Sequence, residues 1–390
     1  MKQKQTKFFL LASLVLIITI AVIYISIFRL QVGSSVSAGW WIKSVYDYKE
    51  HFTEQIKEPK IIIASGSNAL FGVDSRVITS ITGYPSTSLS VHAGLNLDFL
   101  YFKIQKHLKQ GDILVMPLEY FYYYNTEEIL SQWFVSNMIA WGETEYLDKI
   151  SFLSYLAFIA NTPKERILNG LYHLGKKSKL PSKNEVMNEL KEIHNKKNYK
   201  FYGYSHRSLN KYGDILAPKR PNDVVSSIFF NTGEDYTTTN TELDPAFLAD
   251  FEKIQKLADL RGAKLILTWP VTMRNKLFDL GTEPHQARVS LLSEKLSENG
   301  VKIECEPGLF NLHYKFFLND RYHLNSVGAN IRSISLGNCI KGLIENRVET
   351  YTFESSLEKV KALEAKYNYG SSGLEWKEVD KTYSAHLRPH

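Results

Sequence analysis

Short apolar runs of strand length alternate with helix-like stretches in two separate parts of the chain. Each run is flanked by turn-forming or charged residues, and together they are Ile61–Ala64, Thr87–Val91, Ile113–Met116, Leu265–Trp269 and Val301–Ile303. Strands that alternate with helices favour right-handed crossovers and a parallel sheet covered on both faces. The pattern therefore predicts a three-layer α/β/α sandwich around a mainly parallel five-stranded sheet.

The alternation stops between about residues 125 and 240. Helical spacing there predicts amphipathic helices over Glu127–Trp141, Asp148–Ala160, Lys164–Leu174 and Asn184–Asn195, followed by an irregular stretch rich in Tyr, Asn and Gly. We interpret 125–240 as a helical insertion that separates two parts of one core, 59–124 and 241–345. A last helix is expected over Ser355–Tyr367, within a C-terminal helix and tail at 346–390.

The N-terminal segment is the most apolar part of the chain. Phe8 to Phe28 is 21 residues without a charge, which as a helix would be about 31 Å long, enough to cross a bilayer core. Three lysines precede it, so the positive-inside rule predicts that the N-terminus is cytoplasmic and that the chain after the anchor is extracytoplasmic. The predicted segments are a cytoplasmic tail at 1–7, a single transmembrane anchor at 8–28 and a juxtamembrane segment at 29–58. A cleaved signal peptide ending at Val36-Ser37-Ala38 is the alternative, although its apolar region would be unusually long.

Composition and charge narrow the class of protein. With 44% apolar and 23% charged residues, the chain can bury a sizeable core, which excludes a disordered protein or a multi-span transporter. The first 29 residues carry four of the 47 basic groups and no acid, so the rest has 43 basic against 41 acidic groups. Such a balance predicts no nucleic-acid partner. The two cysteines, Cys305 and Cys339, can form a disulfide outside the cytoplasm or stay as buried thiols.

Candidate chemistry follows the first two predicted strands, because open parallel sheets bind ligands at the carboxyl ends of their strands. Ser65-Gly66-Ser67-Asn68 follows the first strand, where a turn can expose the Ser67 hydroxyl and present its N–H to an oxyanion. An ordinary helix N-cap is the simpler alternative. Gly94, after the second strand, can offer another N–H or can simply permit a turn.

A pair of residues near the end of the core can supply the base. Asp320 and His323 are three residues apart in a predicted loop. The carboxylate can then hold Nδ1–H of the imidazole and leave Nε2 to take a proton from a serine. No cluster of Asp and His ligands is visible in the sequence, so we expect neither a metal nor another cofactor.

Aromatic residues follow the third and fourth strands. Tyr120 and Tyr122 belong to an aromatic run, and Trp269 ends the fourth strand. Their ring faces can stack on sugars, so they are the candidate substrate-binding residues, although packing beneath the insertion explains them equally well.

The serine turn, Gly94 and Asp320-x-x-His323 together resemble the SGNH (GDSL-like) hydrolase family over about residues 59–124 and 241–345. The resemblance implies a flavodoxin-like sheet, Ser67 as nucleophile, His323 as base and Asp320 as the residue that orients it. It also implies an oxyanion hole formed by the amides of Ser67 and Gly94.

The chain departs from the family pattern at one block. The family's Gly-x-Asn-Asp has no counterpart, and Glu119-Tyr120-Phe121 stands in its place. A third oxyanion donor is therefore missing, and Asn68 or Asn96 is the candidate substitute.

The anchor, the insertion and Phe71-Gly72-Val73-Asp74 further resemble extracytoplasmic proteins of bacterial envelope modification. These include the D-alanine transfer protein of teichoic acids and the O-acetylation proteins of alginate and peptidoglycan. The resemblance implies acyl transfer to a cell-surface polysaccharide on the periplasmic or extracytoplasmic side of the bacterial cytoplasmic (inner) membrane, beside a membrane-bound O-acyltransferase partner. A carbohydrate esterase of the same fold and a non-catalytic glycan-binding or assembly module are the alternatives.

Overall fold

The chain forms two compact units. The computed structural model describes residues 2–33, 39–124, 131–172, 180–196, 200–217, 242–275, 277–347 and 349–367 of the 390-residue chain. Met1–Trp40 clusters with Glu127–Leu180 in the first unit, and Trp41–Thr126 clusters with Pro181–His390 in the second. The region predicted as one insertion, 125–240, is therefore divided between the two units.

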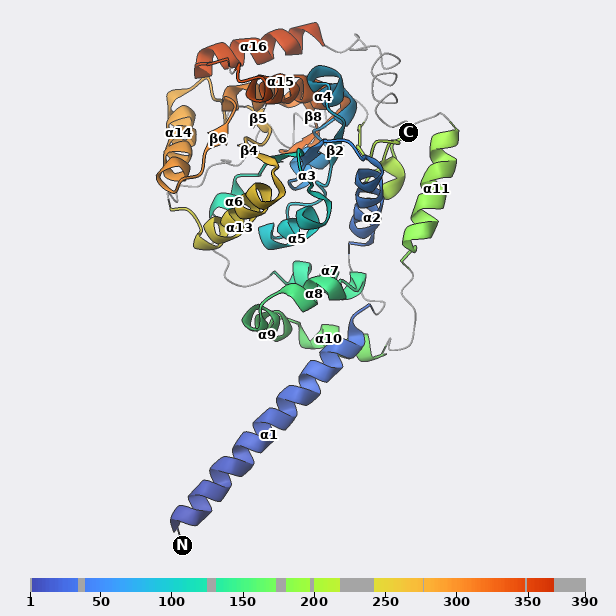
Figure 1. The fold of residues 1–390 in the computed structure, drawn as a ribbon, viewed down its shortest axis with the longest axis vertical. Helices are drawn as coiled ribbons and strands as arrows, with labels where there is room; N and C mark the ends of the chain where they lie inside the picture. Colours follow the sequence, from blue (N-terminus) through green and yellow to red (C-terminus); the bar gives the residue numbers. More distant parts are fainter. Residues whose placement is uncertain are drawn as a thin grey trace. The chain divides into compact units, whose positions relative to one another are not determined.

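The first unit is helical among the residues described. Its helices are α1 (Lys2–Gln31), α7 (Gln132–Trp141), α8 (Thr144–Lys149), α9 (Phe152–Ala160) and α10 (Lys164–Tyr172). Within α1, the most apolar 18-residue window of Lys4–Gln31 has a mean hydropathy of 2.9 and is not buried against the protein. In the described part of the chain, α1 alone is long and apolar enough to cross a membrane. Figure 1 shows its C-terminal end beside α10.

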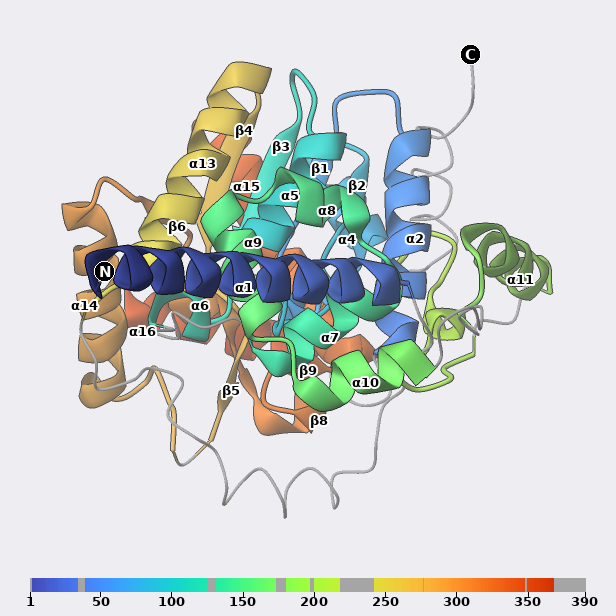
Figure 2. The same cartoon turned by 90° about the horizontal axis from the view of Figure 1, so that it is seen from below.

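The second unit is built on a parallel sheet of five strands in the order β2-β1-β3-β4-β6. The strands are β1 (Ile61–Ile63), β2 (Ser86–Ser88), β3 (Ile113–Pro117), β4 (Lys264–Thr268) and β6 (Ile303–Glu304). Figure 2 shows β2, β1, β3 and β4 side by side. The three isoleucines of β1 have no exposed surface, as expected for a strand covered on both faces. The predicted α/β class and the five strands are confirmed, with small shifts at the strand ends.

Helices connect and cover these strands. They are α2 (Trp40–Gln55), α3 (Ser67–Leu70), α4 (Ser75–Thr82), α5 (Leu97–His107), α6 (Phe121–Tyr124), α11 (Lys183–Asn195), α13 (Pro245–Arg261), α14 (Glu283–Glu298), α15 (Ser326–Ile344) and α16 (Phe353–Lys366). Helix α5 packs on α13, and α4 packs on α15. Local signals fix the ends of α13, since Asp244 caps its first turn and Gly262 ends it in the left-handed region.

Several short elements lie outside the predicted pattern. The strands are β5 (Thr272–Arg274), β7 (Asn311–His313), β8 (Phe317–Asp320) and β9 (His323–Leu324), and the 3-10 helices are η1 (His206–Ser208), η2 (Pro307–Phe310) and η3 (Tyr314–Phe316). Elements of two to four residues contain too few positions to show a period. The antiparallel β8–β9 hairpin matters most, because it carries His323.

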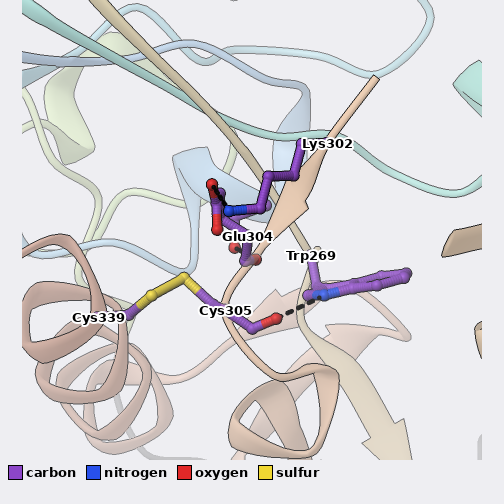
Figure 3. The surroundings of a disulfide bond; sticks show 6 residues. Trp269, Lys302, Glu304, Cys305 and Cys339 are labelled. Carbon is purple, nitrogen blue, oxygen red and sulfur yellow. Dashed lines mark hydrogen bonds and ion pairs between the residues drawn. A yellow bond between two sulfur atoms is a disulfide. The ribbon is translucent and has the colours of Figure 1, made fainter. Parts of the chain in front are cut away.

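Cys305 and Cys339 form a disulfide that links the end of β6 to α15 (Figure 3). Trp269, just after β4, donates its Nε1–H to the carbonyl oxygen of Cys305 at 3.1 Å. Of the two alternatives left open by the sequence, the structure has the bonded form.

Replacing both cysteines with serine is expected to lower the free energy of unfolding by about 4 kcal/mol, because the bond restricts a loop of 34 residues in the unfolded chain. Urea denaturation of the full chain in detergent micelles measures this difference. Wild-type protein treated with a reductant is the control and should unfold like the double variant. Equal midpoints for the oxidised wild type and the double variant would contradict the prediction.

Candidate functional site

The turn after β1 is centred on Ser67, the first residue of α3. Ser67 is partly buried. Among the described residues, neither its N–H nor its Oγ has a hydrogen-bond partner. The flanking amides of Gly66 and Asn68 are both used, since they donate to Glu119. The Ser67 amide and hydroxyl are therefore the groups of this turn that remain for a substrate.

The carboxylate of Glu119 lies against this turn and is fully buried. Its Oε2 accepts hydrogen bonds from Ser65 Oγ at 3.0 Å and from the Gly66 N–H at 3.2 Å, and its Oε1 accepts the Asn68 N–H at 3.0 Å. A Cβ on Gly66 would lie 2.4 Å from Glu119 Oε1 and 2.6 Å from the Cα of Ala93. Only glycine allows this approach. Glu119 therefore shapes the serine turn from the position where the family pattern has other residues.

A buried arginine completes the network. Arg332 of α15 donates Nη1–H to the carbonyl oxygen of Asn68 at 2.6 Å and Nη2–H to its Oδ1 at 2.5 Å. Burial lowers the pKa of Arg332 to about 9, and the charge of Glu119 opposes this shift. A Cβ on Gly72 would lie 2.4 Å from Arg332 Nη1. Gly72 in Phe71-Gly72-Val73-Asp74 is therefore required to admit the guanidinium group.

Asn68 does not supply the missing oxyanion donor. Its Nδ2–H donates to Ser65 Oγ at 2.8 Å and to the Pro117 carbonyl oxygen at 2.9 Å, and its backbone N–H donates to Glu119. All of its donors are used inside the turn, and the residue is buried. The prediction that Asn68 donates to the oxyanion is therefore wrong, because Asn68 holds the turn together instead. The alternative donor, Asn96, is the N-cap residue of α5 and stays a prediction.

The β8–β9 hairpin brings His323 to the serine turn. Asp320 and His323 face each other in the antiparallel pair, and β9 lies against α3. The His323 ring packs on the ring of Phe71 with centroids 4.4 Å apart, and Phe71 directly follows α3. The fold therefore brings together the segments of Ser67 and His323, as predicted, although they lie near opposite ends of the core sequence.

The hydrogen bonds of His323 differ from the prediction. Its Nδ1 lies 3.0 Å from Tyr204 Oη and 3.2 Å from Asn319 Oδ1, and Asn319 Nδ2–H donates to Tyr204 Oη at 2.9 Å. The Asp320 carboxylate accepts the Tyr322 N–H at 3.0 Å, and within the described residues no hydrogen bond joins it to His323. The prediction that Asp320 orients His323 is therefore wrong. Nδ1 of His323 lies within hydrogen-bond distance of Asn319 and Tyr204 instead.

This arrangement allows His323 to act as a base. An Nδ1–H that donates to Asn319 Oδ1 leaves Nε2 as the proton acceptor. Burial lowers the pKa of His323 to about 4, while the charge of Asp320 raises it and His92 lowers it further. The imidazole is therefore neutral, and able to take a proton, at neutral pH.

The acid limb of the pH profile of kcat/KM is expected near pH 4 rather than near 6.5, because protonated His323 cannot accept a proton from Ser67. In Asp320→Asn the limb should move to still lower pH, since a charge that favours the imidazolium is gone. Rates on an acetyl ester across this range measure both effects. A limb near pH 6.5 in both proteins would contradict the prediction.

Asn319→Ala is expected to lower turnover by about 10²–10⁴-fold, the range of a lost general base, because the His323 tautomer is no longer fixed. Asp320→Asn is the matched comparison in the adjacent residue, and it should reduce turnover less. Turnover and the unfolding midpoint are measured for both. A larger loss in Asp320→Asn would restore the predicted role of Asp320.

The second predicted oxyanion donor, Gly94, is engaged elsewhere. Its N–H donates to Nδ1 of His92 at 2.9 Å. Because Nδ1 accepts, the neutral ring of His92 has its proton on Nε2, and burial lowers the pKa of His92 to about 4. In this conformation Gly94 therefore orients His92 rather than pairing with the Ser67 amide as predicted.

The predicted substrate-binding aromatics are core residues. Tyr120, Tyr122 and Trp269 are 1%, 6% and 3% exposed and belong to the hydrophobic core. Buried rings present no face to a sugar, so their predicted role is corrected and the packing alternative holds. The aromatic side chain beside His323 that is exposed is Tyr204, at 45%.

Two cavities lined by described residues lie away from this site. One of about 550 Å³ adjoins the disulfide and is bordered by Glu306, Tyr351 and Lys359 among others. One of about 600 Å³ lies between α13 and the strands β4 and β6. Neither includes Ser67 or His323, so the candidate site is defined by converging side chains and not by either cavity.

Comparison with known proteins leaves the family open. No protein-family model matches the chain, and no curated protein matches it in sequence.

Besides Arg332, four residues of the site go beyond those predicted. Glu119 and His92 follow β3 and β2, so the rule that ligands gather at strand ends is the signal that could have found them. Asn319 directly precedes Asp320. Tyr204 has no sequence signal, because it lies in an aperiodic stretch 119 residues before His323.

Proposed function

We propose that this protein is an extracytoplasmic serine O-acyltransferase that modifies a cell-surface polysaccharide. The observation that carries the proposal is the packing of the Ser67 turn against the β8–β9 hairpin with His323. The fold thus brings the turn of a serine whose hydroxyl has no partner in the described part of the chain to the strand of a buried imidazole, and a serine activated by a histidine is a pairing that nucleophilic catalysis uses.

In the proposed reaction His323 Nε2 takes the proton from Ser67 Oγ, and Oγ bonds to the acyl carbonyl carbon. The Ser67 N–H donates to the resulting oxyanion. The intermediate collapses to an acyl-serine ester, and His323 returns the proton to the departing oxygen of the donor. A sugar hydroxyl, deprotonated by His323, then attacks the ester, and the proton passes back to Ser67 as the acylated sugar leaves.

We also infer that the second unit has the three-layer, flavodoxin-like architecture of SGNH hydrolases. The strand order β2-β1-β3-β4-β6 supports this inference. So do the two helix pairs, α5 with α13 and α4 with α15, which suit opposite faces of the sheet.

The proposed location is the outer face of a bacterial cytoplasmic membrane. The length and hydropathy of α1 suit a single-pass anchor, and Lys2, Lys4 and Lys7 favour a cytoplasmic N-terminus. The disulfide suits an oxidising, extracytoplasmic compartment. A membrane-bound O-acyltransferase is the proposed partner, because an anchored enzyme needs its acyl donor supplied at the bilayer.

Two alternatives share the site. If water replaces the sugar hydroxyl, the same acyl-serine gives a carbohydrate esterase. A non-catalytic glycan-binding or assembly module is favoured by the bond between Gly94 and His92, which leaves the Ser67 amide without its predicted companion.

Treatment of the full chain with a fluorophosphonate tests the enzyme proposal. We expect one adduct, on the peptide that contains Ser67, seen by mass spectrometry. Serines exposed elsewhere, such as Ser297 of α14, are internal controls and should stay unmodified. Folded protein that gains no adduct on Ser67 would favour the binding module.

A further inference from the structure

The exposed face of α9 is unexplained by acyl transfer. The nine residues of α9 include no charge, and its Phe152, Leu153 and Leu156 are 71%, 77% and 36% exposed. Leu168 and Tyr172 of α10 add side chains that are 66% and 75% exposed. A helix that is apolar on all sides normally lies in a protein core or a membrane. Water is therefore an unfavourable surrounding for this face.

Helix α9 is fixed against the last turns of α1. Phe28 has no exposed surface and meets the ring of Tyr155 edge-on, with centroids 6.0 Å apart. Tyr24 donates its hydroxyl to the carbonyl oxygen of Ile159 at 3.3 Å, and Arg29 donates Nε–H to Tyr155 Oη at 3.0 Å. Figure 1 shows the corresponding end of α1 among the helices of the first unit. The depth of α1 in a bilayer would therefore set the depth of α9.

The contacts of α9 fall at one level of α1. Tyr24 and Phe28 end the uncharged stretch, and Arg29 is the first charge after it. In a spanning helix this is the level where hydrocarbon gives way to headgroups, which Tyr and Arg favour. Apolar helix faces at this boundary enter the lipid by about 5–10 Å. Helix α9 has no charged side chain that would oppose such entry.

We propose that α9, together with Leu168 and Tyr172 of α10, lies in the outer interface of the bilayer and contacts lipid directly. The inference rests on the proposed anchoring by α1. Lipid is the occupant because α9 is bonded to the last turns of α1, whose most apolar window is not buried by the protein. In this arrangement α9 and α10 of the first unit contact lipid next to the spanning helix α1.

Spin labelling of the full chain in phosphatidylethanolamine–phosphatidylglycerol vesicles tests the proposal. The two native cysteines are joined, so one introduced cysteine is the sole free thiol. Leu153→Cys probes α9, and Ile17→Cys probes the middle of α1. Leu260→Cys is the matched control, a leucine of α13 that is 85% exposed in the second unit. Collision rates with oxygen and with a water-soluble nickel chelate are measured at each site.

At position 153 we expect oxygen to collide more often than the chelate, as at position 17, and the order to reverse at position 260. A label at 153 that behaves like the one at 260 overturns the interface proposal while the anchor stands. A label at 153 that is shielded from both reagents also overturns it, because protein and not lipid then covers α9. Chelate access at position 17 overturns both the anchor and this inference.

Discussion

Ser67→Ala is expected to abolish acyl transfer, with turnover on an acetyl ester falling by at least about 10³-fold. In the proposed mechanism Ser67 Oγ is the atom that bonds to the acyl carbon. The variant should remain folded, because within the described residues Ser67 Oγ makes no hydrogen bond and Glu119 holds the turn through neighbouring groups. We expect its free energy of unfolding to stay within about 0.5 kcal/mol of the wild type.

Ser297→Ala is the control for this experiment. Ser297 is exposed on α14 and belongs to no part of the site, so its loss should leave turnover and fluorophosphonate labelling unchanged. If folded Ser67→Ala kept the turnover of the wild type, Ser67 would not be the nucleophile. An equal loss in both variants would show that the assay does not report on the site.

Glu119→Ala is expected to lower the free energy of unfolding by about 2–6 kcal/mol, because two buried N–H groups lose their acceptor at a cost of about 1–3 kcal/mol each. The substitution leaves the N–H groups of Gly66 and Asn68 without their acceptor, whereas Ser65 Oγ keeps the Pro117 carbonyl oxygen at 2.6 Å. It also removes the negative charge that stabilises the buried guanidinium of Arg332. Urea denaturation in detergent micelles measures the change, and the serine turn should lose its shape together with its activity.

Two further variants make this prediction specific. Glu119→Gln keeps the shape and one acceptor oxygen but loses the charge, so its destabilisation should fall between those of the wild type and Glu119→Ala. Glu294→Ala removes an exposed carboxylate from α14 and should change the free energy of unfolding by less than about 0.5 kcal/mol. Equal unfolding midpoints for Glu119→Ala and Glu294→Ala would show that the network does not stabilise the fold.

The two substitutions separate chemistry from scaffold. Ser67→Ala should remove activity with the fold intact, whereas Glu119→Ala should reduce stability and activity together. The ordinary-cap alternative for Ser67 is wrong, because Gly66 is the N-cap of α3 and no side chain caps this helix. If Ser67→Ala were also strongly destabilised, its hydroxyl would have another structural partner in the protein.

The sheet was predictable because its signal is local. The apolar runs at Ile61 and Ile113 belong to strands buried on both faces, and such burial requires consecutive apolar residues whatever the rest of the chain does. The hairpin that carries His323 shows no such signal. Its strands are four and two residues long, so their pairing depends on the surrounding fold.

The candidate site was predictable only in part. Ser67 and His323 were found by their positions after the first strand and before the last helix of the core, and the fold brings their segments together. Asp320 was predicted to bond to His323, and Gly94 to share an oxyanion with the Ser67 amide, and the structure shows neither arrangement. A side chain in a turn can rotate toward several neighbours, and sequence spacing cannot choose between Asn319 and Asp320 as the partner of an imidazole.

By itself, the sequence determined the apolar N-terminal helix, the parallel strands and the identity of a serine and a histidine that could react. These features depend on hydrophobic patterning and on residue type, which are properties of each segment of sequence by itself. Only the tertiary structure decided that Glu119 and Arg332 hold the serine turn, that Tyr204 reaches His323, and that Trp269 is buried. Such contacts join residues far apart in the chain, and their energy depends on distances that exist only after folding.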